Sequence, residues 1–225
     1  AGMSAMFVMM NSARLHVGLQ GLGHAQRAMQ LAKAYAGERR QMRAVTKPEG
    51  ELGNGPDPII HHPIIRRSLL EMQALVEGMR AIGYWTAHSF DMKSMSTDSL
   101  ECQRLEVRVG LLTPIIKSFF SEQGFKISSQ ALQVFGGYGY IKEYGIEQIV
   151  RDSRVVMLYE GTNEIQANDL LIRKVYGDRA VGLNDLIAEM LAELKGEDIY
   201  GYVQLVNSAA SRLLKVTELL LASDD

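Results

Sequence analysis

The placement of proline constrains the fold of this chain more than any other feature. Five prolines occur in 225 residues, and four of them lie between Pro48 and Pro63. Proline lacks a backbone N–H and its ring clashes with the preceding helical turn, so it ends or kinks helices. The rest of the chain is therefore free to form long helices. The stretch 46–58, TKPEGELGNGPDP, is rich in Gly, Pro, Asn and Asp and is the one clear loop.

Apolar residues on both sides of this loop recur with helical spacing. The first stripe is Leu15, Leu19, Leu22 and Met29, and the second is Leu69, Met72, Val76 and Met79. Two further residues, Leu75 and Ile82, widen the second stripe and predict a helix that is buried on two sides, as in a bundle. Three glycines in the first helix, Gly18, Gly21 and Gly23, would let a neighbouring backbone approach closely.

A third helix is predicted from about Asp98 to Phe135, with Asp98 or Thr97 as its N-cap. We expect Pro114 either to kink this helix or to restart it. The glycines of Phe135-Gly136-Gly137-Tyr138-Gly139-Tyr140 favour the left-handed backbone conformation that follows a helix end.

Shorter helices are predicted in the last third of the chain. Their ranges are Ile146–Met157, Asn163–Tyr176 with Thr162 as N-cap, Leu183–Lys195 and Tyr202–Leu221. The run 155–158 is too short and isolated to build a sheet. The sequence therefore predicts an all-α, up-and-down helical bundle with extra C-terminal helices.

Composition excludes several classes of function. The chain has 24 basic and 26 acidic residues, for a formal charge of −2, so it lacks the basic excess of a nucleic-acid-binding protein. A single cysteine, Cys102, excludes an internal disulfide and a multi-cysteine zinc site. No run of about 20 apolar residues could span a membrane. We expect a cytoplasmic bacterial protein, and we expect a fragment boundary ahead of residue 1 because the first residues run straight into a helical pattern.

Four features could carry chemistry, and each has a simpler explanation. Adjacent His61 and His62 would point about 100° apart on a helix, so they favour a helix start at Pro63 over a metal site. The glycines of FGGYGY either cap a helix or admit a ligand. The cations of Glu38-Arg39-Arg40-Gln41 could clamp phosphate or could simply be solvated at a helix C-terminus.

The fourth feature is Glu160, which lies in a turn directly before a predicted helix N-terminus. Burial would raise its pKa and make it a usable base near neutral pH. The N–H groups of the following helix could stabilise a developing negative charge. A solvated loop glutamate is the simpler interpretation, and these residues alone leave both open.

Taken together, these motifs resemble the C-terminal domain of the acyl-CoA dehydrogenase family. The resemblance covers about 7–176 and is strongest in three segments that occur in the family's order. These segments are ALQVFGGYGY at 131–140, RDSR at 151–154 and YEGTNEIQ at 159–166. The loop and His61-His62-Pro63-Ile64-Ile65-Arg66-Arg67 are similar to the branch that acts on 3-methylmercaptopropionyl-CoA.

The resemblance implies that Glu160 is the catalytic base. It would remove the α-proton of an acyl-CoA thioester while the β-hydrogen leaves as hydride to FAD, giving a trans-2-enoyl-CoA. Some relatives place their base at the position of Ala13, which cannot accept a proton. The implied substrate-contacting residues are Asn11, Ser12, Ala13, Arg14, Tyr159 and Gly161.

The resemblance also implies FAD as cofactor. Met42 and Arg43 replace the Phe-Gly that follows the family's arginine and glutamine. The segment 133–137 would approach FAD from a neighbouring subunit. The implied FAD-contacting residues are Arg39, Arg40, Gln41, His62, Gln133, Val134, Phe135, Gly136, Gly137, Thr162, Asn163 and Glu164.

The family pattern sets expectations for domains and partners. Residues 1–177 correspond to the C-terminal bundle and 178–225 to the start of a helical extension, while the family's N-terminal and middle β-domains are absent from this chain. We expect a homodimer or tetramer, and an electron-transfer flavoprotein as acceptor of the full-length enzyme. We expect the isolated chain to be inactive. Alternatives are a non-catalytic oligomerisation module, an acyl-CoA oxidase and an adaptive-response flavoprotein.

Overall fold

The computed structural model describes residues 2–46, 55–194 and 200–223, so most of the predicted loop at 46–58 lies outside the described residues. Within the described ranges the chain is helical and contains no strand. In these ranges, one isolated antiparallel β-bridge joins Arg40 and Pro58. The predicted all-α class is therefore confirmed. Among the helices that are described, none is long and apolar enough to cross a membrane.

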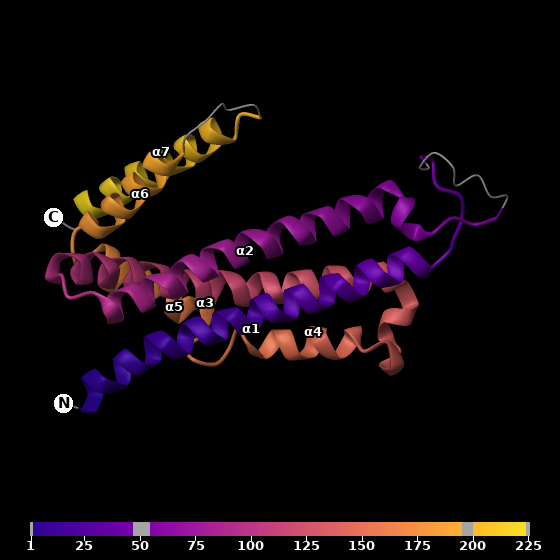
Figure 1. The fold of residues 1–225 in the computed structure, drawn as a ribbon, viewed down its shortest axis with the longest axis horizontal. Helices are drawn as coiled ribbons and strands as arrows, with labels where there is room; N and C mark the ends of the chain where they lie inside the picture. Colours follow the sequence, from indigo (N-terminus) through magenta and orange to yellow (C-terminus); the bar gives the residue numbers. More distant parts are fainter. Residues whose placement is uncertain (1, 47–54, 195–199, 224–225) are drawn as a thin grey trace.

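Four helices run alternately up and down the length of the molecule (Figure 1). They are α1 (Gly2–Glu38), α2 (Pro63–Met95), α3 (Ser99–Phe135) and the shorter α4 (Ile146–Val155). A 3₁₀ turn, η1 (Ile59–His61), leads into α2, whose first residue is the proline of the His-His-Pro segment. The up-and-down order predicted from the sequence is confirmed.

The contact between α1 and α3 depends on glycine. A Cβ at Gly21 would lie 2.4 Å from the Phe120 carbonyl oxygen, and a Cβ at Gly124 would lie 2.6 Å from the Gly21 oxygen. Gly18 is equally close to Ile116. These two predicted close approaches, at Gly18 and Gly21, are confirmed. The same prediction for Gly23 is wrong, because that residue is exposed with nothing within 4 Å of a built Cβ.

Helix α2 is buried on one side, so the prediction of burial on two sides is wrong for the chain by itself. The core side carries Leu69, Met72, Val76 and Met79, each at most 9% exposed. Leu75 and Ile82 are 36% and 40% exposed on its outer side. The physical reason is that α1 and α3 both pack against the same side of α2.

Helix α3 begins and ends where the sequence predicted. Asp98 is its N-cap and accepts a hydrogen bond from the Leu100 N–H at 2.9 Å. Gly136 follows its end with φ of +60°. The helix passes through Pro114 without a break, so the alternative of a restart there is wrong.

The chain turns back after α3 through two short 3₁₀ segments, η2 (Gly136–Tyr140) and η3 (Lys142–Tyr144). Helix α4 then ends at Val155, two residues before the predicted end. The predicted helix Asn163–Tyr176 is divided into α5 (Asn163–Asn168) and a π-helical segment, η4 (Asp169–Val175). Asp169, the first residue of η4, is buried.

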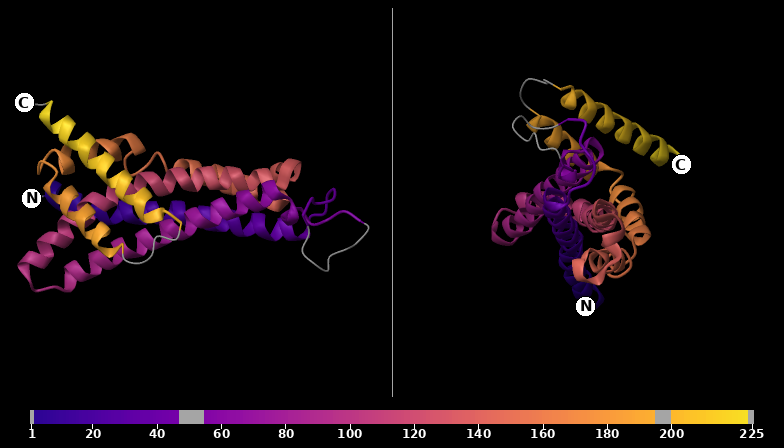
Figure 2. Two further views of the ribbon diagram at one scale, coloured as in Figure 1. Left: turned by 90° about the horizontal axis from the view of Figure 1, so that it is seen from above. Right: turned by 90° about the vertical axis from the view of Figure 1, so that its right-hand side faces the viewer.

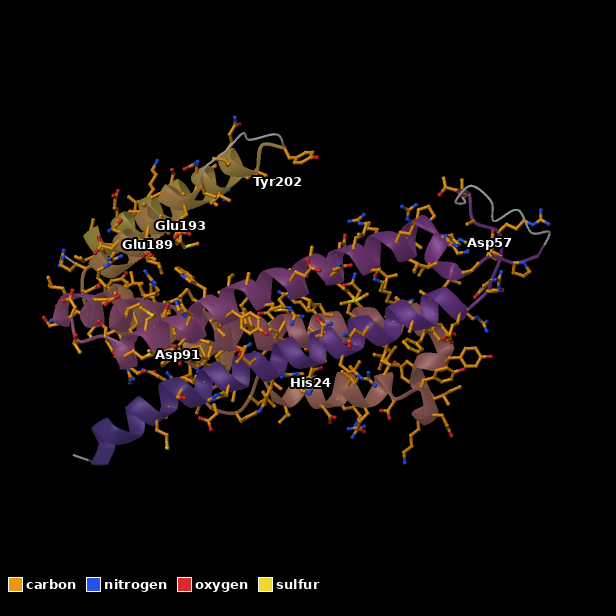
Figure 3. All side chains as sticks on the ribbon, in the orientation of Figure 1. His24, Asp57, Asp91, Glu189, Glu193 and Tyr202 are labelled. Carbon is orange, nitrogen blue, oxygen red and sulfur yellow. The ribbon has the colours of Figure 1, made fainter. Side chains whose placement is uncertain are left out.

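Helices α6 (Val181–Glu193) and α7 (Tyr202–Ala222) form an antiparallel pair beside the N-terminal end of α3. Of the described elements, α7 packs against α6 alone and stands apart from the bundle (Figure 2). The pair is tied to α3 by Arg108, which donates to both carboxylate oxygens of Glu189 and stacks over Trp85. Figure 3 labels Glu189 on this helix pair. The bundle is thus one packed unit that carries a projecting hairpin.

Candidate functional site

The turn between α4 and α5 has a strained backbone at Glu160. Its φ is +55°, in the left-handed region that residues with a Cβ rarely adopt. Such conformations cost about 1–3 kcal/mol and are concentrated at functional sites. The Glu160 side chain is exposed in this chain. To act as a base near neutral pH, Glu160 would have to be buried, and the described residues do not bury it.

Gly161 follows with φ of +86° and needs its lack of a side chain for two reasons. The left-handed backbone disfavours other residues, and a Cβ would lie 2.8 Å from Gln166 Nε2. The Gln166 amide is fully buried and donates to the Glu160 carbonyl at 3.1 Å. A side chain on α5 thus fixes the backbone of the turn.

The turn ends in a capped helix. The Thr162 hydroxyl accepts a hydrogen bond from the Ile165 N–H at 3.4 Å, which confirms the predicted N-cap. Asn163 directs its side chain into the bundle, where its Oδ1 accepts from Ser121 Oγ at 3.1 Å. Glu164 is exposed, and its own backbone N–H is the main cause that lowers the pKa of its carboxyl. The two acids of this segment therefore differ in environment, and only Glu160 has a strained backbone.

Arg14 lies beside this turn but is buried. Its Nη1 donates to Asp169 Oδ2 at 3.0 Å, and the two side chains are 6% and 8% exposed. Asn11 and Ala13 are half-buried on the same helix, while Ser12 is exposed. The π-helical widening of η4 delivers the carboxylate that pairs with Arg14.

Tyr159 closes the other side of the turn. Its hydroxyl donates to Gln20 Oε1 on α1. Burial of the ring is the main cause that raises the pKa of this phenol, and the nearby Glu160 charge adds to it. Tyr159 thus ties the turn that carries Glu160 to α1.

A second group of predicted residues lines a pocket of about 650 Å³ at the C-terminal end of α3. The pocket brings together the end of α1, the start of α2 and the turn after α3. The predicted cofactor-contacting residues in its lining are Arg39, Gln41, His62, Gln133, Val134, Phe135, Gly136 and Gly137. Arg40 is not among them, because it turns away to the Pro56 carbonyl.

Aromatic rings form one wall of this pocket. Tyr35 stacks on Phe135 with ring centroids 4.3 Å apart, and the Arg39 guanidinium lies over Tyr138 at 5.2 Å. Stacking leaves the N–H groups at the edge of a guanidinium free to bind a phosphate. His62 Nε2 donates to the Gln41 carbonyl at 2.9 Å, which joins the two segments around the pocket.

Asp57 shapes the segment that follows α1 and was missed in the sequence. It is 5% exposed, and its Oδ2 accepts a hydrogen bond from the Ala44 N–H at 2.8 Å (Figure 3). Its backbone exchanges hydrogen bonds with Gln41 and Met42. An acidic residue between two prolines is a common turn residue, so no sequence signal separated Asp57 from an ordinary loop residue.

The pocket has the groups that an extended dinucleotide requires. Arg39 supplies a cation for phosphate and Gln133 an exposed amide. A Cβ at Gly136 or Gly137 would meet nothing within 4 Å, so the backbone there is open to a ligand. These observations fit FAD as the ligand of this pocket.

The two groups of residues are separate. Lys117 lies beside Gly161 and Phe135 lines the pocket, and the 18 helical steps of α3 from one to the other rise about 27 Å. Thr162, Asn163 and Glu164 thus belong to the turn and not to the pocket. In the part of the chain that the structure describes, no group of three or more His, Cys, Asp or Glu side chains could hold a metal ion.

Comparison with known proteins identifies a consistent set of relatives. Residues 1–175 match the family described as acyl-CoA dehydrogenase, C-terminal domain. The 3-methylmercaptopropionyl-CoA dehydrogenase of Ruegeria pomeroyi is 41% identical over 199 residues, which cover 88% of this chain and 32% of that protein. The broad-specificity linear acyl-CoA dehydrogenase FadE5 of Mycobacterium tuberculosis is 34% identical over 183 residues, which cover 81% and 30%.

Solved structures agree. An acyl-CoA dehydrogenase from Bacillus anthracis complexed with FAD has a TM-score of 0.71 and 27% identity, over 95% of this chain and 36% of that one. Caenorhabditis elegans ACDH-11 in complex with C11-CoA has a TM-score of 0.79 over 96% and 34%, and at 24% identity it supports the fold alone. The chain spans about a third of the length of these curated relatives.

Proposed function

The chain belongs to the acyl-CoA dehydrogenase family, through its C-terminal domain, and from this premise we propose that it contributes the base and part of the cofactor site of an FAD-dependent acyl-CoA dehydrogenase. The observation that carries the proposal is the turn at Glu160. A carboxylate on a strained, internally fixed backbone is placed directly before a capped helix N-terminus.

Glu160 is proposed to remove the α-proton of an acyl-CoA thioester. Proton transfer to a positioned carboxylate contributes about 10²–10⁴-fold to such a step. FAD, when bound, would supply the acceptor for the β-hydride, and the product would be a trans-2-enoyl-CoA. Because Glu160 is exposed in the chain by itself, surfaces contributed by further domains would have to exclude water from it.

The remaining residues of the turn would bind and orient the substrate. Tyr159 and Gly161 flank the base, and the helix of Arg14 lies beside them. The Arg14 guanidinium is already paired with Asp169, so we propose that it holds η4 in place and that Asn11 and Ser12 reach the CoA portion.

The separation of the two groups supports cofactor binding at a subunit interface. Thr162–Glu164 would contact the FAD beside the base, and Arg39 with Gln133–Gly137 would contact the FAD of a neighbouring subunit. The exposed apolar residues on the outer side of α2, such as Leu75 and Ile82, favour a homodimer or tetramer. The same surface supports a second candidate function for the isolated chain, which is oligomerisation without catalysis.

The test uses the full-length protein that contains this chain. Acyl-CoA thioesters of different chain length, including the 3-methylmercaptopropionyl thioester, are offered with an artificial electron acceptor. We expect acyl-CoA-dependent reduction of bound flavin, with an electron-transfer flavoprotein as the proposed natural acceptor. Colourless protein that self-associates and reduces no acceptor would instead favour the oligomerisation module. The 225-residue chain alone is expected neither to retain stoichiometric FAD nor to oxidise acyl-CoA.

A further inference from the structure

A lysine lies at the centre of the bundle, beside the turn that carries Glu160. Lys117 is fully buried, and it is among the largest fully buried side chains of the described residues. Thr113 and Ser121 lie one turn before and after it on α3 and are also fully buried. Burial of an ammonium is costly unless its protons are satisfied, so its partners define what it does.

Both partners of the Lys117 ammonium belong to the turn. Its Nζ donates to the Gly161 carbonyl at 2.6 Å and to Asn163 Oδ1 at 3.2 Å. Asn163 is held further by α3, since Ser121 Oγ donates to its Oδ1 and its Nδ2 donates to the Ser118 carbonyl at 3.3 Å. Gly161 and Asn163, on either side of Thr162, are therefore held by hydrogen bonds to groups on α3.

Gln166 completes this arrangement from the other side. It holds the carbonyl of Glu160, while Lys117 holds the carbonyl of Gly161, so two successive peptide groups are fixed by two buried side chains. Glu160 and Gly161, the residues that carry these carbonyls, both have positive φ. A backbone of this kind persists only where its surroundings over-determine it.

The charges around the Lys117 ammonium come from three elements. Its pKa is lowered from 10.5 to about 8, mainly by burial and in part by Arg14 on α1. Glu160 in the turn and Glu164 on α5 act in the opposite direction. Methionine would fill a similar volume without the desolvation cost, so the distinct contribution of the ammonium is its pair of hydrogen bonds.

We propose, on the basis of the function proposed above, that Lys117 is a positioning residue that fixes the backbone around Glu160 and so sets the direction in which the base meets the acyl thioester. It touches neither substrate nor cofactor in this arrangement. It acts through Gly161 and Asn163. The proposal therefore predicts a change in the rate of the chemical step without a change in substrate binding.

The first test needs neither cofactor nor activity. The amide resonances of Gly161 and Thr162 are followed by NMR in the 225-residue chain from about pH 6.5 to about pH 9.5, a range that brackets a lysine pKa of about 8. We expect both resonances to move with one midpoint near pH 8.

The movement should vanish in Lys117→Met and persist in Lys126→Met, whose side chain is exposed and paired with Glu122. Resonances that do not move in the wild type, or that still move in Lys117→Met, would overturn the proposal, and the wild-type measurement decides even if Lys117→Met does not fold.

The second test uses the FAD-loaded full-length protein. Lys117→Met should lower kcat roughly 10-fold or more, because small misplacement of a catalytic group is costly, and should leave KM within about twofold. Lys117→Arg should recover part of kcat, while Lys126→Met should match the wild type. A rise in KM with unchanged kcat would overturn the positioning role. If the wild-type protein reduced no flavin with any acyl-CoA, the proposed function would fail, whereas the NMR result would separately report whether Lys117 holds the turn.

Discussion

The turn that carries Glu160 is held from inside the bundle, whereas the pocket that carries Arg39 opens to its surface. In the turn, buried Lys117 and Gln166 hold two successive carbonyls of a strained backbone. In the pocket, a Cβ at Gly136 or Gly137 would meet nothing within 4 Å. Both regions lie against α3, yet one is fixed by its own chain and the other is left for a ligand to fill.

This difference separates two requirements of a flavoenzyme. A base must be placed to within a fraction of an ångström before substrate arrives, because misplacement costs rate. A dinucleotide has many polar groups and can be bound by adaptable contacts at an interface. The comparison predicts that substitutions in the turn change rate or stability, while substitutions in the pocket change cofactor affinity.

The largest expected effect is the loss of the proposed base, Glu160. Glu160→Gln in the full-length, FAD-loaded protein keeps the size of the side chain but removes its proton acceptor. The rate of flavin reduction by acyl-CoA should fall at least about 10²-fold, while acyl-CoA should still bind and perturb the flavin spectrum. Stopped-flow absorbance measures both quantities.

Glu164→Gln is the matched control for this substitution. Glu164 is an exposed residue of α5, four positions along the chain, and it is proposed to contact FAD and not the acyl thioester. In the FAD-loaded protein Glu164→Gln keeps the size of that side chain, so the rate of proton removal should stay nearly intact even if FAD affinity changes. Near-normal reduction in Glu160→Gln together with its loss in Glu164→Gln would show that the base has been assigned to the wrong residue.

The second effect compares glycines in the two regions. Gly161→Ala places a Cβ on a backbone with φ of +86° and 2.8 Å from Gln166 Nε2, so it should destabilise the 225-residue chain by about 2 kcal/mol. Gly137→Ala should change the free energy of unfolding by less than about 0.5 kcal/mol. Urea unfolding measures both. Equal losses would mean that the pocket is as internally constrained as the turn.

The third effect concerns the cation of the pocket. Arg39→Met in the full-length protein removes the guanidinium that faces the pocket and should weaken FAD binding roughly 10-fold. Arg40→Met should weaken it less, because Arg40 faces the Pro56 carbonyl. Fluorescence of released flavin in a dilution series gives both affinities. A larger loss with Arg40→Met would contradict the assignment of Arg39.

The sequence predicted the elements of the bundle because their signals are local. An N-cap is specified by residues within one helix, as at Asp98 and Thr162. The close approach of two helices at Gly21 is specified by the absence of a side chain. The exposure of Leu75 was not predictable in the same way, because an apolar stripe has the same spacing whether it meets the core or a second subunit.

The candidate site was predicted through its motif, but the residues that support it were not. Lys117 is a single cation between Thr113 and Ser121 on one side of α3, and nothing in its spacing separates it from a lysine that reaches solvent. Its partners lie 44 and 46 positions away. The positive φ of Glu160 likewise depends on contacts with α3 and α5, which no local pattern reports.

The smallest predicted effect tests whether the turn is fixed by a buried charge. Burial lowers the pKa of Lys117 in the folded chain from 10.5 to about 8, so between these values the unfolded chain binds more protons than the folded one. The free energy of unfolding must then rise with pH across this window, because deprotonation relieves the cost of the buried ammonium. Between about pH 7 and pH 9 the wild type should gain about 1 kcal/mol relative to Lys117→Met, which lacks the titrating group.

Urea unfolding of both proteins at the two pH values measures the gain as a double difference, so that all other titrating groups cancel. Lys126→Met should gain as much as the wild type, because its ammonium is exposed when folded. A double difference of zero would mean that Lys117 titrates as it does in the unfolded chain, so that its ammonium would not be a buried charge that holds the turn.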